Sequence, residues 1–162
     1  MRPNPFRWRW GVMGTGGMAR KFAVAMRDAR DSRLVAVASR SHPSAVAFAD
    51  KYEVEHAHGD YEAMLRNPHV DIVYVALPNH LHAEWTIKAL RAGKNVLCEK
   101  PVALTARDAE RMFAAAEENN VLLMEAFMYA GHPQTKRVLE LIREQRIGEV
   151  KLIEARFGID FG

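Results

Sequence analysis

Cysteine is almost missing from this sequence, since Cys98 is the one cysteine among 162 residues. A single cysteine excludes an internal disulfide bond and a zinc site built from cysteine ligands. Chains without disulfides are typical of reducing compartments, so we expect a cytoplasmic protein. No apolar run approaches the roughly 20 residues of a membrane span. Behind the basic N-terminus no signal-peptide core follows, because Gly14, Gly16, Gly17 and Arg20 interrupt the apolar stretch.

An excess of charge is also missing, because 23 basic residues are nearly balanced by 20 acidic ones, for a formal net charge of +3. A nucleic-acid interface would require basic residues clustered on one face with aromatic residues among them. Only residues 7–10, RWRW, suggest this, and their strict alternation is more typical of a strand with both Trp side chains on one face. We therefore expect no nucleic-acid partner and no membrane contact.

What the sequence does contain is a regular alternation of strand and helix patterns, with apolar residues at 49% of the chain. This alternation is typical of an α/β fold, a doubly wound parallel sheet of the Rossmann type. Apolar runs predict strands at residues 7–13, 34–39, 54–57, 70–77, 95–98, 121–126 and 149–161. Helical spacing predicts helices between them, the last of which covers about residues 133–145.

The first predicted strand ends in a glycine-rich turn, in which Gly14, Gly16 and Ala19 follow the spacing G-x-G-x-x-A. Between a strand and a helix this spacing is typical of dinucleotide binding. The first glycine permits the tight turn, the second lets the backbone approach a pyrophosphate, and the small third residue lets helix and strand pack closely. A plain connection or a methyltransferase loop is the alternative.

The second predicted strand ends in Ser39, Arg40 and Ser41, where an NAD-binding domain would carry an acidic residue for the ribose hydroxyls. A guanidinium can pair with the 2′-phosphate of NADP, so this segment favours NADP over NAD. The alternative is that Ser41 only starts a helix and that Arg40 is a solvated loop charge.

Residues 95–101, NVLCEKP, place Glu99 and Lys100 at the carboxyl end of a buried apolar strand. In an open α/β sheet, ligands bind at that edge. The alternative is a lysine whose stem covers the strand end and whose ammonium extends into solvent.

Four segments extend these observations: GTGGMA at 14–19, ALPNHLH at 76–82, CEKP at 98–101, and MEAFMY at 124–129 with HPQ at 132–134. In order and spacing they resemble the family of glucose–fructose oxidoreductase and inositol dehydrogenase, over nearly the whole chain. The EAFMY version is most similar to the branch of dihydrodiol and xylose-type dehydrogenases, which use NADP. The resemblance implies an NADP-dependent oxidoreductase, with NAD as a possible cofactor.

The resemblance also implies roles for individual residues. Glu99 would contact the nicotinamide ribose, and Lys100 would be the catalytic residue that reaches the reacting hydroxyl or carbonyl, where its ammonium can donate to developing negative charge. Tyr129 and His132 would contact the substrate. Pro78, Asn79 and His82 would line the nicotinamide side. The full set of implied cofactor contacts is Gly14, Thr15, Gly16, Gly17, Met18, Ala19, Ser39, Arg40, Ser41, Leu77, Pro78, Asn79, His82, Glu99 and Lys100.

The family has a second domain, which supplies the substrate pocket, a further catalytic residue and the oligomer interface. The resemblance therefore implies that residues 1–147 are the Rossmann domain and that 148–162 begin a second, α+β domain, present only as its first strand. An unpaired strand would be an exposed edge, through which we expect a homo-oligomer or another partner to pair.

Directly after Tyr129 the chain has Ala130 and Gly131, where the branch has a basic or bulky aromatic residue.

The predicted function is hydride transfer between nicotinamide and a secondary alcohol of a sugar, polyol or dihydrodiol. The alternative is a non-catalytic dinucleotide-binding module or an inactive truncated fragment. The pairs His56/His58 and His80/His82 suggest metal ligands, but pairs two residues apart without a third clustered ligand are poor zinc sites, so we expect no metal.

Overall fold

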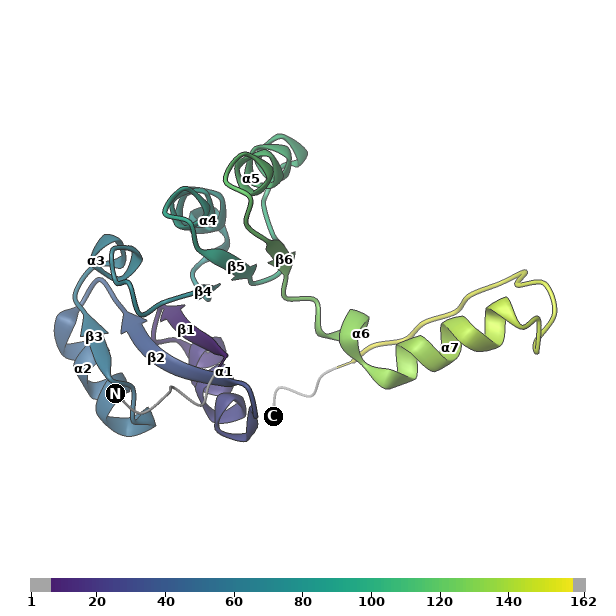
Figure 1. Cartoon of the computed structure of the whole chain (residues 1–162). Helices are drawn as coiled ribbons and strands as arrows, with labels where there is room; N and C mark the ends of the chain where they lie inside the picture. The colour runs from purple at the N-terminus through teal and green to yellow at the C-terminus, as the bar shows by residue number, and fades with distance from the viewer. Residues whose placement is uncertain (1–6, 159–162) are drawn as a thin grey trace. The chain divides into compact units, whose positions relative to one another are not determined.

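The computed structural model describes residues 7–158, and its centre is a parallel sheet of six strands (Figure 1). The strand order is β3-β2-β1-β4-β5-β6, and every neighbouring pair is parallel. This order, with a reversal at β1, is that of a doubly wound dinucleotide-binding sheet, so the predicted fold class is confirmed. The strands are β1 Trp8–Met13, β2 Ser32–Ala38, β3 His56–His58, β4 Ile72–Val75, β5 Asn95–Cys98 and β6 Leu123–Glu125.

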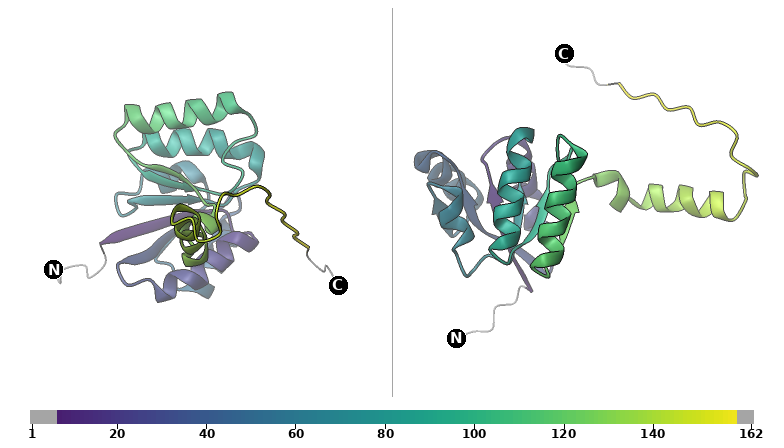
Figure 2. Two further views of the ribbon diagram at one scale, coloured as in Figure 1. Left: turned by 90° about the vertical axis from the view of Figure 1, so that its right-hand side faces the viewer. Right: turned by 90° about the horizontal axis from the view of Figure 1, so that it is seen from above.

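Helices cover both faces of this sheet (Figure 2). Helices α1 (Gly17–Ala25) and α2 (His42–Tyr52) pack on one face, and α3 (Tyr61–Leu65), α4 (His82–Arg91) and α5 (Ala106–Glu118) pack on the other. Within β4, Val73 and Val75 pack in the core beneath α3, α4 and α5, whereas Tyr74 packs in the core beneath α1 and α2. The strands therefore present apolar side chains on both sides, as strands of a covered parallel sheet do.

Local sequence explains where several helices begin and end. Thr105 caps α5 by accepting a hydrogen bond from the backbone of Asp108 at 3.1 Å, and its hydroxyl donates to the Asp108 carboxylate at 2.9 Å. Asp60 caps α3 in the same manner, since its carboxylate accepts from the backbone of Ala63. After α4, Gly93 adopts a φ of +73°, a conformation that suits glycine at a helix end. The residue types at positions 105 and 93 therefore account for the start of α5 and the end of α4.

The strand predicted at 149–161 is wrong for its described part. Residues 149–158 form no strand, and the side chains of Leu152, Ile153 and Phe157 are 75–82% exposed. Alternating apolar residues favour a strand only when a neighbouring strand supplies hydrogen-bond partners, and no described segment pairs with this one. Residues 159–161, the end of the predicted strand, lie outside the described part of the chain.

Two compact units can be distinguished by their internal contacts, Met1–Ala126 and Phe127–Gly162. The first contains the sheet. In the second, the short helix α6 (Met128–Gly131) was not predicted, whereas α7 (Pro133–Arg143) confirms the helix predicted at 133–145. The domain boundary predicted at residue 147 stays a prediction.

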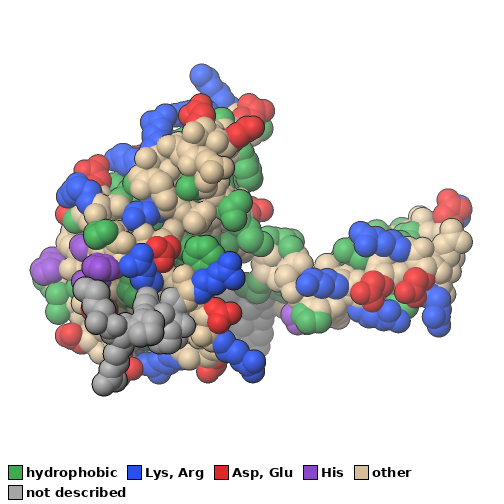
Figure 3. Space-filling model, in the orientation of Figure 1, with side chains coloured by type: hydrophobic (Ala, Val, Ile, Leu, Met, Phe, Trp, Pro, Cys, Tyr) green, Lys and Arg blue, Asp and Glu red, His purple; other side chains and the backbone are tan. Residues whose placement is uncertain are grey.

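The described surface carries charges of both signs, and Figure 3 shows basic and acidic side chains interspersed on the face it presents. Within residues 7–158, no helix has the length and apolar character that crossing a membrane requires.

Candidate cofactor site

The carboxyl ends of the central strands meet at one edge of the sheet. The parallel register pairs Met13 of β1 with Val75 of β4, and Val75 with Cys98 of β5. The residues that directly follow these positions, the glycine-rich turn at 14–19 and the segment 99–101, are therefore brought to the same edge. In a sheet of this topology, that edge is where nucleotides bind.

Gly14 has to be a glycine. Its φ is +98°, a region that side chains other than glycine rarely adopt. A Cβ atom at this position would lie 2.8 Å from the carbonyl oxygen of Ala76. The backbone N–H of Gly14 donates to the carbonyl oxygen of Ala38 at 2.8 Å. The turn after β1 is therefore held between the ends of β2 and β4, as the predicted role of the first glycine requires.

Packing within the described residues does not require glycine at positions 16 and 17. A Cβ atom at either position would have no described neighbour within 4 Å, so nothing inside this part of the chain needs a glycine there. Gly16 is the N-cap residue of α1 and forms no side-chain hydrogen bond, which leaves the first amides of α1 to a ligand. Ala19, by contrast, is fully buried against the sheet. These residues fit the pyrophosphate of a dinucleotide.

The end of β2 contains a buried serine and an exposed arginine. The Ser39 hydroxyl accepts from the backbone N–H of Ser41 at 3.3 Å, and the Ser41 hydroxyl accepts from that of Ser44 at 3.4 Å, which caps α2. Ser41 therefore does start a helix, as the alternative interpretation held. Arg40 is exposed, and its guanidinium is the long cationic donor of this segment.

The segment after β4 changes from buried to exposed within three residues. Leu77 is buried, whereas Pro78 and Asn79 are exposed at the start of the short helix η2 (Asn79–Leu81). Pro78 and Asn79 are thus accessible at the edge of the sheet. This arrangement is compatible with the predicted contact to the nicotinamide side.

His82 does not reach the surface of the site. Its side chain is fully buried at the first turn of α4, its Nδ1 lies 2.8 Å from the carbonyl oxygen of Pro101, and its Nε2 lies 2.8 Å from that of Leu77. Each ring nitrogen therefore faces a backbone carbonyl oxygen, and the buried ring presents neither nitrogen at the surface. The His82 ring thus lies between the carbonyl oxygen of Leu77, in the segment after β4, and that of Pro101, which directly follows Lys100.

Glu99 is buried at the end of β5, and both of its carboxylate oxygens are engaged. Oε1 accepts from the hydroxyl of Tyr74 at 2.5 Å, and Oε2 accepts from the backbone N–H of Lys100 at 3.2 Å. Sequence reasoning did not single out Tyr74. The signal was a tyrosine within a buried apolar strand, because such a hydroxyl needs a hydrogen-bond partner.

Lys100 is exposed next to this buried carboxylate. Among residues 7–158 its ammonium has no hydrogen-bond or ion-pair partner, so its three N–H groups are available at the edge. A flexible cationic donor at this place could stabilise a hydroxyl or carbonyl oxygen on which negative charge develops.

Tyr129 and His132 belong to the unit Phe127–Gly162. The ring of Tyr129 packs against Phe127 with centroids 5.6 Å apart, and Nδ1 of His132 accepts from the backbone of Gln134 at 3.1 Å, which caps α7. The structure thus explains His132 as a helix cap. Substrate contact by either residue stays a prediction.

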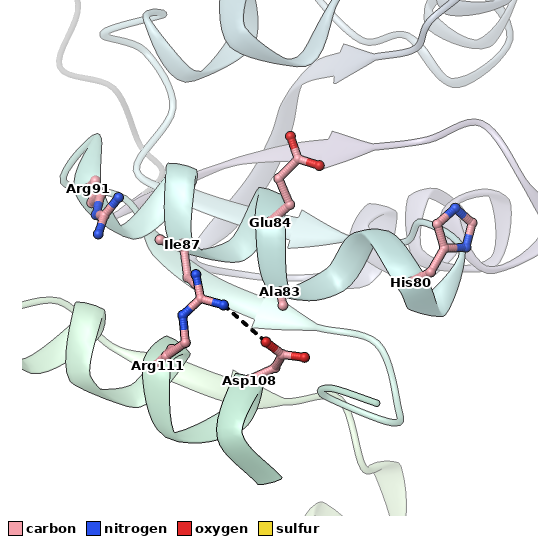
Figure 4. Close-up of a pocket in the computed structure, with 7 residues that line it drawn as sticks. All are labelled: His80, Ala83, Glu84, Ile87, Arg91, Asp108 and Arg111. Atoms are coloured by element: carbon pink, nitrogen blue, oxygen red, sulfur yellow. Dashed lines mark hydrogen bonds and ion pairs between the residues drawn. The ribbon is translucent and has the colours of Figure 1, made fainter. Parts of the chain in front are cut away.

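A separate groove of about 370 Å³ lies between α4 and α5 (Figure 4). It is lined by side chains of both signs, and Arg111 is paired with Asp108 at 3.1 Å. Nowhere in residues 7–158 do three His, Cys, Asp or Glu side chains come together in a way that could hold a metal ion.

Comparison with known proteins agrees with this geometry. The profile of the glucose–fructose oxidoreductase and inositol dehydrogenase family, described as "Oxidoreductase family, NAD-binding Rossmann fold", matches residues 8–127. This chain belongs to that family. The resemblance inferred from the four sequence segments is therefore confirmed.

The relatives of this chain include dehydrogenases and reductases. The dTDP-3,4-didehydro-2,6-dideoxy-alpha-D-glucose 3-reductase of Actinomadura kijaniata is 43% identical over 96% of this chain and 46% of its own length. Trans-1,2-dihydrobenzene-1,2-diol dehydrogenase of Xenopus laevis is 38% identical over 93% of this chain and 46% of its own. D-xylose 1-dehydrogenase (NADP(+)) 2 of Haloferax volcanii is 39% identical, with 91% and 45% covered.

Among solved structures, KijD10, a 3-ketoreductase from Actinomadura kijaniata in complex with NADP, superposes with a TM-score of 0.80. It is 44% identical, and the match covers 90% of this chain and 46% of that one. The chain spans about half the length of the curated relatives it matches.

Proposed function

We propose that this chain is the cofactor-binding domain of an NADP-dependent oxidoreductase, which transfers hydride between nicotinamide and a secondary alcohol of a sugar, polyol or dihydrodiol. The observation that carries the proposal is the register of β1, β4 and β5. It brings a glycine turn with open space above Gly16 to the same sheet edge as the exposed ammonium of Lys100.

Each group at this edge has a part in the proposed chemistry. NADP, when bound, would supply the hydride acceptor or donor. The amides at the start of α1 would hold the pyrophosphate, and the exposed Pro78 and Asn79 would face the nicotinamide. The Glu99 carboxylate has lone pairs left to accept from the ribose hydroxyls. Lys100 would donate to the reacting oxygen and exchange a proton with it.

NADP is favoured over NAD because the end of β2 presents Arg40 to solvent, and no carboxylate stands in the segment 39–42 to accept from a ribose 2′-hydroxyl. A guanidinium is also the group best suited to a 2′-phosphate. The NADP complex of KijD10 and the NADP(+) in the name of the Haloferax relative support this preference.

The substrate class rests on the relatives, whose names include a sugar-nucleotide reductase, a dihydrodiol dehydrogenase and a xylose dehydrogenase. A homo-oligomer is part of the proposal, but pairing through a strand at 149–158 is not, since that strand does not form. A cytoplasmic location stays a prediction that rests on the single cysteine.

Cofactor titration tests the proposal. NADPH, NADP and NADH are titrated against the purified chain by intrinsic and nicotinamide fluorescence, and micromolar affinity for NADPH is expected. Gly16→Val should abolish binding without unfolding the chain, because a Cβ at Gly16 has no described neighbour within 4 Å. The control is Gly131→Val, also in open space but in the second unit. Absence of binding to any of these cofactors would contradict the proposal.

Turnover is tested separately with a panel of sugars, polyols and diols. Lys100→Met should lose turnover but still bind NADPH, because the donor to the reacting oxygen is removed while the amides at the start of α1 and the guanidinium of Arg40 remain. Binding of NADPH without any turnover by the wild type would favour a non-catalytic module instead.

A further inference from the structure

Tyr74 belongs to β4, and its side chain lies in the core on the face of the sheet that α1 and α2 cover. It is 3% exposed, and its ring packs on Phe22 of α1 with centroids 4.3 Å apart. Phe22 in turn packs on Trp10 of β1 at 5.4 Å. The ring therefore packs against α1, the helix whose first amides would hold the pyrophosphate in the proposed function.

Among residues 7–158 the hydroxyl of Tyr74 has one hydrogen-bond partner, the Oε1 atom of Glu99, at 2.5 Å. Burial is the main reason that the pKa of Tyr74 is raised above its ordinary value, and the hydrogen bond to Glu99 adds to the effect. The hydroxyl therefore stays a proton donor throughout the physiological range. The backbone N–H of Lys100 donates to the Oε2 atom, so each oxygen of the Glu99 carboxylate accepts a hydrogen bond.

We propose that Tyr74 is a positioning residue, whose hydroxyl fixes the rotamer of the Glu99 carboxylate at the sheet edge so that its free lone pairs meet the ribose hydroxyls of the cofactor. The inference rests on the proposed function, because only that function places a ribose at this edge. A carboxylate with fixed orientation loses less conformational freedom when the cofactor binds, and affinity rises accordingly.

A purely structural role for Tyr74 would depend on its ring alone. Phenylalanine keeps the ring, its contact with Phe22 and its place in the core, and removes only the hydroxyl. Tyr74→Phe therefore separates the two roles. Glu99→Met is the matching change on the other side, since methionine is of similar length but offers no carboxylate oxygen.

The first experiment is a double-mutant cycle without cofactor. The equilibrium constant for unfolding is measured for the wild type, Tyr74→Phe, Glu99→Met and the double variant. The hydrogen bond predicts a coupling of at least about twofold between the two changes, whereas independent effects would multiply. Multiplicative effects on unfolding would overturn the inference.

The second experiment measures the dissociation constant of NADPH for the same four proteins. Tyr74→Phe is expected to weaken binding by about 3- to 10-fold, and the double variant should bind like Glu99→Met alone, because Tyr74 acts only through Glu99. The control Tyr52→Phe, in α2 and packed on Phe48, should bind within about twofold of the wild type.

The outcomes separate the two proposals. If the wild type binds NADPH and Tyr74→Phe binds it equally well, the positioning role is wrong and the proposed function stands. If the wild type binds no nicotinamide cofactor, the proposed function falls, and the positioning role falls with it.

Discussion

His82 offers the sharpest test of how the site is held together. The proposed change is His82→Leu, which replaces the imidazole by an apolar side chain of comparable size at a fully buried position. The leucine cannot donate to the carbonyl oxygens of Leu77 and Pro101, each of which lies 2.8 Å from a ring nitrogen in the wild type. The cost therefore comes from unsatisfied buried acceptors more than from a cavity.

The magnitude follows from the number of bonds lost. A buried acceptor left without a partner costs about 1–3 kcal/mol. A neutral imidazole donates through one nitrogen and a doubly protonated one through both. The free energy of unfolding should thus fall by about 1–3 kcal/mol if one bond is lost and by about 2–6 kcal/mol if both are. For a chain of this size each kcal/mol lowers the melting temperature by about 2–4 °C.

Urea denaturation followed by circular dichroism measures this loss. His82→Gln should recover part of the stability, since its amide can still donate to one carbonyl. His80→Leu, an exposed neighbour, is the control and should change the free energy of unfolding by less than about 0.5 kcal/mol. A His82→Leu variant as stable as the wild type would refute the reasoning, because it would mean that the two carbonyls lose nothing.

Two further predictions concern other ionisable groups. Burial raises the pKa of the Cys98 thiol to about 11, and the residue is 0% exposed. A thiol reagent at pH 8 should therefore label the chain only after denaturation. Rapid labelling of the folded protein would contradict this prediction. The hydrogen bonds from Arg9 lower the pKa of Asp71 below its ordinary 3.8, so the ion pair stabilises the fold above that pH and the stabilisation is lost as pH falls below it. Asp71→Asn should therefore lower the free energy of unfolding at pH 7 by roughly 1–3 kcal/mol, with a difference from the wild type that shrinks below pH of about 4. If the difference in the free energy of unfolding between Asp71→Asn and the wild type stays the same in acid, the assignment is contradicted. As the control, removal of the exposed carboxylate of Glu140 should change the free energy of unfolding by less than about 0.5 kcal/mol.

Much of the fold could be predicted because its signals are local. The positive φ at Gly14, the cap at Thr105 and the positive φ at Gly93 each depend on the residue type at or within a few residues of that position, and the structure has all three. The strand at 149–161 fails because a strand is not a local structure. Its alternating pattern is present, but the hydrogen-bond partners have to come from another segment.

The sequence by itself determined the class of sheet, the glycine turn, the arginine at the end of β2 and the lysine at the end of β5, because each of these depends on residue type and spacing along the chain. Only the tertiary structure decided what surrounds them. It buried His82 between two carbonyls instead of exposing it to a cofactor, and it placed the hydroxyl of Tyr74 on Glu99, 25 residues away. Such contacts depend on how β4 and β5 pair and on which face each side chain takes, and no spacing within a single segment encodes them.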